Sequence, residues 1–199
     1  MIKNALIRES LVLASRSPRR AEILQAVGWP FETMAADIDE SLLEGEDAID
    51  YVRRLAEGKA KVVAAKQPDK LVLGADTTVV IDRQILGQPS DPEDARKMLR
   101  LLNGTWHEVI TGVALLRFGG NPVEIVDYET TRVHFAELSV EEIDWYVSTG
   151  EPLGKAGAYG IQGKAGPFID EIQGDYFNIV GLPIRLVYEL RQRLRSSVR

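Results

Sequence analysis

The chain has 199 residues, of which 45% are hydrophobic and 27% are charged, a composition typical of a soluble globular protein. Its formal net charge of −6 argues against a general nucleic-acid-binding surface, and no apolar run approaches the roughly 20 residues that a membrane-spanning helix needs. The absence of cysteine excludes disulfides, thiol nucleophiles and cysteine-based zinc sites; together with an N-terminus that lacks a secretory signal pattern, it fits a cytoplasmic protein.

Short strands and helices alternate in the first part of the chain. Residues 10–15 predict a buried strand, and Pro18 then opens a helix that ends at Gly28. Residues 31–40 predict a weak strand that runs into an acidic loop. A strongly periodic helix is expected at residues 46–66.

The central part is expected to be mostly β-structure. A buried strand at residues 70–76 continues through residues 77–87, with a turn at residues 82–84, and a helix follows at residues 91–102. Two long β-type runs then flank the sequence Gly-Gly-Asn, which is a hairpin signal. These runs are residues 105–118 and residues 122–138.

The last part combines a capped helix, a glycine-rich tract and a second β-type run. Ser139 begins a helix with a capping box, and residues 154–166 carry glycine at every third position. So regular a glycine tract, flanked by globular sequence, indicates close backbone approach or sharp turns rather than collagen. Residues 168–182 predict a second hairpin around Gly174, and Pro183 opens the final helix.

These elements predict the fold class. Strands alternate with helices, but two hairpins interrupt the alternation, which favours an α/β fold with a mixed sheet over a purely parallel one. No linker or change of composition marks a boundary, so residues 1–199 are expected to form a single domain.

Two arginines stand in the first turn of the first predicted helix. Arg19 and Arg20 follow Pro18 there, although the positive end of the helix dipole disfavours basic side chains by about 0.3–1 kcal/mol each. A multiply charged anion bound at this helix end would offset that cost. The alternative is a chance Arg-Arg pair on an exposed turn.

Three further charged residues are candidates for chemistry, and each has a plainer explanation. Asp76 follows the run Leu-Val-Leu-Gly-Ala and is expected to end a strand, where it would be either a turn residue or a catalytic group at the carboxyl edge of a sheet. Glu40 lies in an acidic loop and Lys59 in a predicted helix, and both patterns favour a solvated surface position over a catalytic one.

Several common catalytic motifs are absent. The sequence has no Walker A loop, no dinucleotide-binding glycine fingerprint and no nucleophile elbow, and its two histidines, His107 and His134, fall on separate predicted strands as structural or surface residues. What remains is a set of basic groups with one or two carboxylates. That set suits metal-assisted phosphoryl or nucleotidyl transfer, in which carboxylates hold a divalent ion and basic groups neutralise phosphate oxygens.

Six segments together resemble the Maf family of nucleoside triphosphate pyrophosphatases. They occur in the family's order and extend over roughly residues 10–190: LASRSPRRAEIL, LAEGKA, GADTTV, ITGVAL, KAGAYGIQG and GDYFNIVGLP. The resemblance implies a strongly curved mixed sheet with flanking helices, in two lobes around a central cleft, as in inosine triphosphatase-like folds. It also implies hydrolysis of a nucleoside triphosphate to the monophosphate and pyrophosphate with Mg²⁺ or Mn²⁺, in a cytoplasmic homodimer without nucleic-acid or membrane partners.

The glycine-rich segment resembles that of the branch acting on dTTP, UTP and some modified pyrimidine nucleotides. By motif, Asp76 corresponds to the proton acceptor for the attacking water and, with Glu40, to the metal site. The resemblance assigns base preference to Arg19, Thr77 and Gln162. It places Ser15, Arg20 and Lys59, together with Glu40, at the phosphate and metal site, and Lys155 is a further substrate-binding candidate. An amide at Gln162 could pair with the imide edge of uracil or thymine, because it offers both a donor and an acceptor.

Two departures from the family pattern bear on activity. Gln88 replaces a lysine that the family often has after the second strand, and Gly154 replaces a common aspartate before the segment that carries Lys155 and Gln162. Two alternatives therefore accompany dTTP/UTP hydrolysis. One is a 7-methyl-GTP or broad-specificity pyrophosphatase that removes non-standard nucleotides; the other is a non-catalytic, nucleotide-binding regulator of division, since the family is linked to septum formation.

Overall fold

The computed structural model describes residues 9–196, and it has a mixed α/β architecture, as the sequence predicted. Seven strands form one sheet in the order β2-β1-β3-β5-β6-β7, with β4 paired to β3. β1 (Leu11–Leu13) runs parallel to β2 (Phe31–Thr33) and β3 (Leu71–Ile81). β4 (Gln84–Leu86) and β7 (Ile169–Gln173) pair antiparallel, with β3 and β6 respectively.

The chain divides into two compact units, and each is built from discontinuous segments. The first unit holds the described residues up to Asp76 together with residues 111–129 and the segment from Gly181 onward. The second holds residues 77–110 and 130–180. The strands β3, β5 (Trp106–Arg117) and β6 (Val123–Phe135) contribute residues to both units.

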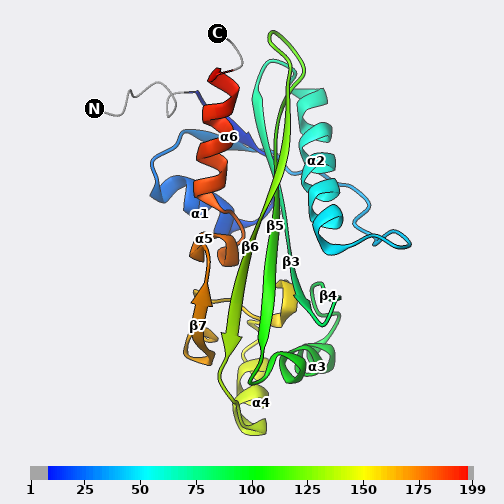
Figure 1. The fold of residues 1–199 in the computed structure, drawn as a ribbon, viewed down its shortest axis with the longest axis vertical. Helices are drawn as coiled ribbons and strands as arrows, with labels where there is room; N and C mark the ends of the chain where they lie inside the picture. The colour runs from blue at the N-terminus through cyan, green and yellow to red at the C-terminus, as the bar shows by residue number, and fades with distance from the viewer. Residues whose placement is uncertain (1–8, 197–199) are drawn as a thin grey trace. The chain divides into compact units, whose positions relative to one another are not determined.

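In the first unit, helices cover both faces of the sheet. α2 (Ala48–Lys66) lies on one side, and α1 (Pro18–Ala26) and α6 (Ile184–Ser196) lie on the other (Figure 1). Side chains of a strand alternate between its two faces, so Val12 faces α2 while the fully buried Leu11 and Leu13 face away from it. The α2 side is packed mainly with small residues: Ala14, Ala56, Ala60, Val63, Ala64, Val72 and Ala114.

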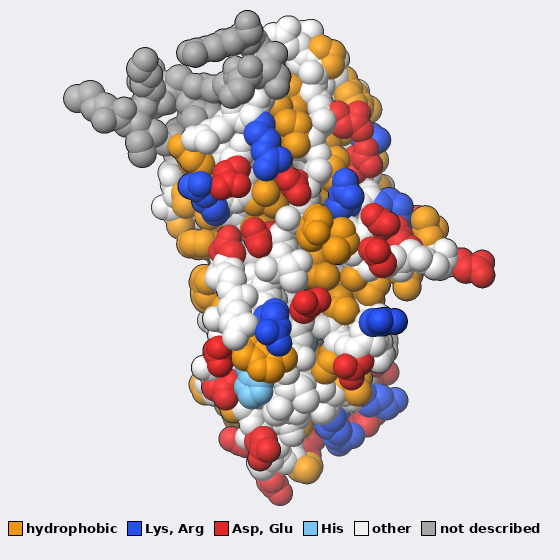
Figure 2. Space-filling view, in the orientation of Figure 1, with side chains coloured by type: hydrophobic (Ala, Val, Ile, Leu, Met, Phe, Trp, Pro, Cys, Tyr) orange, Lys and Arg blue, Asp and Glu red, His pale blue; other side chains and the backbone are white. Residues whose placement is uncertain are grey.

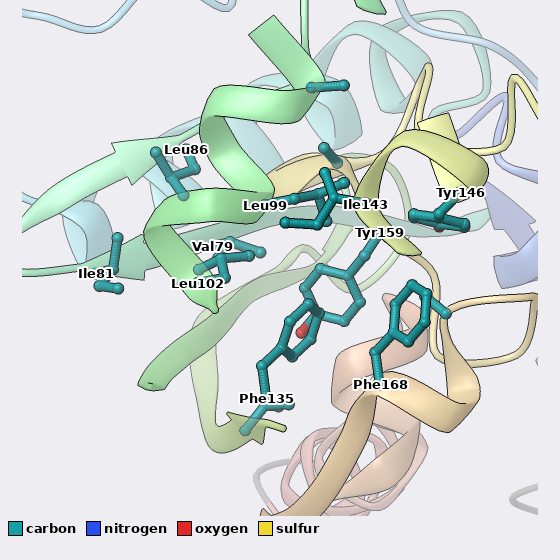
Figure 3. Packing of buried hydrophobic residues seen from close by; sticks show 14 of the residues in the cluster. Val79, Ile81, Leu86, Leu99, Leu102, Phe135, Ile143, Tyr146, Tyr159 and Phe168 are labelled. Carbon is teal, nitrogen blue, oxygen red and sulfur yellow. The ribbon is translucent and has the colours of Figure 1, made fainter. Parts of the chain in front are cut away.

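In the second unit, larger apolar side chains form the core. α3 (Pro92–Leu102) and α4 (Val140–Ser148) pack on residues from β3, β4 and β6, and Figure 3 shows Tyr159 and Phe135 stacked edge to face within this cluster. The capping box that opens α4 at Ser139 is present as predicted. The glycine-rich tract forms turns and two short 3₁₀ helices, η1 (Ala156–Ala158) and η2 (Gly166–Phe168).

The predicted hairpin around Gly-Gly-Asn and the predicted turn after residue 81 are both present. β5 and β6 are neighbours in the sheet and are joined through residues 118–122. β3 and β4 pair with Ile81 opposite Gln84, and the two residues between them, Asp82 and Arg83, both have positive φ angles of 48° and 65°. Two positive φ angles in a two-residue loop are typical of a type I′ turn, which matches the twist of the flanking strands.

The predicted second hairpin at residues 168–182 is wrong. β7 ends at Gln173, and the chain then turns into α5 (Tyr176–Val180) instead of a second strand. Asp175 explains the difference, because its carboxylate accepts a hydrogen bond from the Phe177 amide at 2.7 Å and so caps a helical turn. Among the described residues, no helix is long and apolar enough to cross a membrane.

Candidate functional site

The pairing of β1 with β3 sets the position of Asp76. Leu13 pairs with Leu73, and the Ala14 amide donates to the Leu73 carbonyl at 2.8 Å. β1 therefore ends at Leu13, whereas β3 continues beyond Leu73 and through Asp76. Ser15 lies two residues after the end of β1. The prediction that Asp76 ends its own strand is wrong, since it lies inside the 11-residue β3; the carboxyl end beside it belongs to β1.

A close approach of α2 to β3 brings Lys59 to Asp76. A Cβ atom at Gly74 would stand 2.1 Å from the Ala56 carbonyl oxygen, so only glycine allows the helix to come this near. Asp76 lies two residues after Gly74 on the same face of the strand, and Lys59 lies one helical turn after Ala56. Lys59 Nζ consequently donates to Asp76 Oδ1 at 2.6 Å.

Lys59 also contacts a second carboxylate. Its Nζ lies 2.7 Å from Glu40 Oε1, in the segment between β2 and α2, and the Glu40 side chain is 54% exposed. Lys59 itself is buried, so the solvated helix face that its pattern favoured is wrong for this residue. One ammonium thus joins a buried carboxylate and an exposed one.

Arg20 is the buried member of the arginine pair. Its Nε donates to the Gly181 carbonyl at 2.8 Å and its Nη1 donates to Ser15 Oγ at 3.1 Å, while Arg19 is half-buried. Ser15 Oγ also accepts from the Ser17 amide at 3.1 Å, which leaves its own proton available to donate. Ser17 makes no side-chain cap, and the first turn of α1 has no acidic residue of its own.

The charges in this group act on one another. Burial raises the pKa of Asp76 above its ordinary value, whereas Lys59 and Arg20 oppose that rise. Burial lowers the pKa of Arg20, and the Asp76 carboxylate opposes that fall. A carboxylate held between two cations in a site with little water is suited to exchange a proton with a substrate group.

The other predicted residues belong to the second unit. Thr77 lies half-buried in β3 directly after Asp76, and Gln162 is exposed in the glycine-rich segment. Lys155, in the same segment, donates through Nζ to the Glu151 carbonyl. One group of predicted residues therefore lies within the first unit, and it is called the Asp76 group below: Ser15, Arg20, Glu40, Lys59 and Asp76. Lys155 and Gln162 lie in the glycine-rich segment of the second unit.

The two carboxylates fit a divalent metal that arrives with a phosphate ligand. Within residues 9–196, no group of three or more His, Cys, Asp or Glu side chains could hold a metal ion. Asp76 and Glu40 nevertheless both reach the Lys59 ammonium, which marks a point between them where a cation is favoured. Mg²⁺ is commonly bound by only one or two carboxylates, with substrate phosphates and water completing its shell.

Sequence reasoning missed Gly181 as a partner of the site. The Arg20–Gly181 hydrogen bond joins residues 161 positions apart, and no spacing rule relates them. The only available signal was the segment GDYFNIVGLP, which contains Gly181 but gives no hint of Arg20. The histidines, by contrast, are structural as predicted: His107 Nε2 lies 2.8 Å from the Tyr159 hydroxyl, and His134 pairs with Asp170.

The sequence model of the family described as Maf-like protein matches residues 10–194. The chain belongs to the Maf family. The match includes every residue of the Asp76 group and both compact units.

Proteins from several bacteria are about half identical to this chain. A protein of Koribacter versatilis is 52% identical over 183 residues, which is 92% of this chain and 93% of that protein. A protein of Hahella chejuensis is 53% identical over 180 residues, or 89% and 88% of the two chains. Both relatives are named dTTP/UTP pyrophosphatase.

Among solved structures, a HAM1 protein from Coxiella burnetii is similar at a TM-score of 0.46 and 16% identity. The alignment covers 65% of this chain and 74% of that one. A likeness this distant adds nothing to the family assignment.

Proposed function

We propose that this Maf protein hydrolyses dTTP and UTP to the nucleoside monophosphate and pyrophosphate. The observation that carries the proposal is the buried Asp76 carboxylate, which pairs with Lys59 at 2.6 Å and feels the charge of Arg20. Relatives that are about half identical over most of the chain and are named for this activity support the substrate class.

Each residue of the Asp76 group has a role in the proposed reaction. Asp76 accepts a proton from the water that attacks phosphorus, and the bond between the α and β phosphates breaks. Arg20 and Lys59 neutralise phosphate oxygens, and the Ser15 hydroxyl donates to one of them. Arg19 adds positive charge at the same helix end. Asp76 and Glu40 would hold Mg²⁺ or Mn²⁺, which neutralises phosphate charge when bound.

In this proposal Arg19, Thr77 and Gln162 set the base preference, as the resemblance to the family implies. Gln162 presents an amide that can both donate to and accept from the imide edge of uracil or thymine, with Thr77 and Lys155 as further contacts. A purine would leave such polar groups unpaired, and unpaired polar groups reject a wrong substrate strongly.

Pyrophosphate release from dTTP, UTP, CTP, GTP and 7-methyl-GTP tests the proposal, with Mg²⁺, with Mn²⁺ and with a chelator. We expect release from dTTP and UTP only, and only with metal. Preference for 7-methyl-GTP, or equal rates on all five, would assign another substrate class. Nucleotide binding without release under any condition would favour a regulator.

Asp76→Asn tests the catalytic assignment directly. The variant should lose turnover by a factor on the order of 10²–10⁴ and keep its affinity for dTTP, because the amide cannot take the proton. Asp69→Asn, which changes an exposed carboxylate just before β3, is the matched control and should keep the wild-type rate. Wild-type release by the Asp76→Asn variant would reject the assignment.

A cytoplasmic homodimer remains part of the proposal. Closed two-fold dimers are the commonest soluble oligomers. Sedimentation of the purified protein and fractionation of the cells that produce it would test the two statements separately. A monomer, or a protein found in the membrane fraction, would contradict them.

A further inference from the structure

Residues 37–47, the last part of the segment between β2 and α2, carry Glu40 and are called the Glu40 loop below. It stands out beside α2 with acidic side chains at its tip (Figures 1 and 2). Leu42 and Leu43 are each 54% exposed, so these two side chains do not hold the loop, whereas Ile38 is half-buried, with its Cδ1 atom 3.3 Å from where a Cβ atom of Gly58 in α2 would stand. Beyond Ile38, polar contacts hold the part of the loop that carries the Glu40 carboxylate.

Two side chains of α2 hold the backbone of the loop on either side of its first turn. The Tyr51 hydroxyl donates to the Glu40 carbonyl at 3.0 Å, and Arg54 Nη2 donates to the Ser41 carbonyl at 3.0 Å. The Asp39 carboxylate accepts from the Ser41 amide at 2.9 Å and closes the turn itself. Three hydrogen bonds thus converge on residues 39–41.

Arg54 also fixes the far end of the loop. Its Nε and Nη2 donate to the Glu46 carboxylate at 2.5 Å and 2.7 Å, a forked ion pair in which the Glu46 side chain is 7% exposed. Glu46 Oε2 in turn accepts from the Leu43 amide at 3.1 Å. Hydrogen bonds from Arg54 lower the pKa of Glu46, so this carboxylate stays ionised and paired.

One helix, α2, carries both the side chains that hold the loop backbone and the lysine that pairs with Glu40. Tyr51 bonds the Glu40 carbonyl and Arg54 the next carbonyl along the chain, and Lys59, further along α2, holds the Glu40 carboxylate at 2.7 Å. An exposed carboxylate on a loop with freely moving backbone would rarely occupy one position, because ordering each residue costs about 1–2 kcal/mol. Because the backbone is already anchored to α2, this entropic cost does not have to be met when the Glu40 carboxylate acts on a bound metal ion.

We infer that Tyr51 and Arg54 are positioning residues, which set the Glu40 carboxylate beside Lys59 so that it can act with Asp76. The inference rests on the proposed function of the Asp76 group. Neither residue touches the phosphate in this account. Both act through the Glu40 loop.

Two variants remove the anchors with little change of shape. Arg54→Met keeps most of the aliphatic stem and removes the fork, and Tyr51→Phe removes one hydroxyl. Arg53→Met is the matched control, because Arg53 is exposed and its one described partner, Asp50, lies 3.9 Å away on the same helix. Urea unfolding of all three would confirm that each is folded before it is compared.

Hydrogen–deuterium exchange gives a readout that does not depend on activity. Arg54→Met should speed exchange of the loop amides, Leu43 above all, by roughly tenfold or more, and Tyr51→Phe should speed it by less. Arg53→Met should leave it unchanged. Adding Glu46→Gln to Arg54→Met should speed exchange little further, because the fork is already lost.

Kinetics with dTTP then test positioning. We expect kcat to fall roughly fivefold to twentyfold in Arg54→Met, the size of one or two lost hydrogen bonds, with dTTP affinity within about twofold of wild type. The Mg²⁺ concentration for half-maximal rate should rise several-fold. Faster loop exchange with unchanged kcat and Mg²⁺ dependence would overturn the inference, as would unchanged exchange.

The two failures are distinguishable. A wild-type protein that releases no pyrophosphate from any nucleotide overturns the proposed function, and with it the catalytic part of this inference. The exchange arm still decides in that case whether Arg54 anchors the Glu40 loop. An active wild type with active, unaltered variants overturns the inference alone.

Discussion

Lys59 Nζ donates to Asp76 Oδ1 at 2.6 Å, and each side chain is only 11% exposed. A pair this buried gains little net stability over apolar residues of the same shape, because both charges have left water. Removing one partner is different, since the remaining charge is then buried without compensation. The pair is better explained by chemistry at Asp76 than by stability.

Lys59→Met should therefore destabilise the protein by about 3 kcal/mol in urea unfolding, because Asp76 keeps its charge or must take up a proton. Adding Asp76→Asn should recover part of that loss, although each change alone is unfavourable. Lys61→Met, which changes an exposed lysine of the same helix, should shift stability by less than about 0.5 kcal/mol. A double variant no more stable than Lys59→Met would contradict this account.

The opposing influences on Asp76 predict the acid side of the pH–rate profile. Burial raises the pKa of Asp76 above 3.8 and Arg20 opposes the rise, so kcat/KM should fall with decreasing pH in a limb above pH 3.8. Arg20→Gln should move that limb to higher pH, in addition to weakening substrate binding. Arg16→Gln, at an exposed neighbouring position, should not move it. A slower Arg20→Gln enzyme with an unmoved limb would show that Arg20 does not tune Asp76.

The first-unit site was only partly visible in the sequence. Apolar runs and helix caps located the strands and helices that carry Arg20, Lys59 and Asp76, since those signals are local. Their meeting was not local: it depends on Gly74 admitting the Ala56 carbonyl and on the pairing of Leu13 with Leu73. For this reason the helical periodicity of residues 46–66 favoured a solvated side chain at Lys59. The apolar run before Asp76 likewise placed Asp76 at the end of its strand.

Residues 168–182 show a second limit of sequence reasoning. The alternating pattern after Gly174 is compatible with a strand, and the sequence alone does not reveal whether Asp175 starts a turn between strands or caps a helix. In the structure, Thr131 Oγ1 accepts from the Asp175 amide at 3.0 Å. The neighbouring Asn178 is fully buried and donates to the Val109 carbonyl at 2.9 Å. Both partners are remote in sequence, and they favour the helical turn.

The close packing of α2 on β3 at Gly74 can be tested by substitution. Gly74→Ala would place a methyl group 2.1 Å from the Ala56 carbonyl oxygen and 2.9 Å from the Ala60 Cβ atom, so α2 must move away from β3. We expect a loss of about 2–4 kcal/mol in unfolding free energy and a lower rate on dTTP, because Lys59 moves with the helix. Gly87→Ala meets no atom within 4 Å and should change neither quantity appreciably. Equal stability of the two variants would argue against the close approach.

Gln88 offers a test of a departure from the family pattern. It is exposed in the second unit, at a position where the resemblance to the family predicts a lysine. If a cation there acts on phosphate oxygens, Gln88→Lys should raise kcat/KM on dTTP by roughly twofold to tenfold, as expected for one partly exposed charge contact. Gln84→Lys, on the exposed surface of β4, is the matched control. An unchanged rate for Gln88→Lys would show that this position is peripheral in the present chain.

The buried His107 should make the stability of the protein fall at acid pH. Burial lowers its pKa from 6.5 to about 4, with a smaller contribution from His134, and its ring contacts the Tyr159 hydroxyl and Phe135. The unfolded chain therefore binds a proton that the folded chain excludes between these two pH values. Stability from this residue is complete above pH 6.5 and is lost as the pH falls towards 4, by on the order of 3 kcal/mol.

Urea unfolding from pH 7 to pH 4 measures this effect as a difference between wild type and His107→Gln. Carboxylates titrate in both proteins and largely cancel, so the wild type should lose about 3 kcal/mol more than the variant, whereas His134→Gln should keep most of the wild-type loss. The variant can still bond Tyr159 through its amide, which separates the titration from the hydrogen bond. Parallel curves for wild type and His107→Gln would mean that the ring is protonated as readily in the folded state as in the unfolded one.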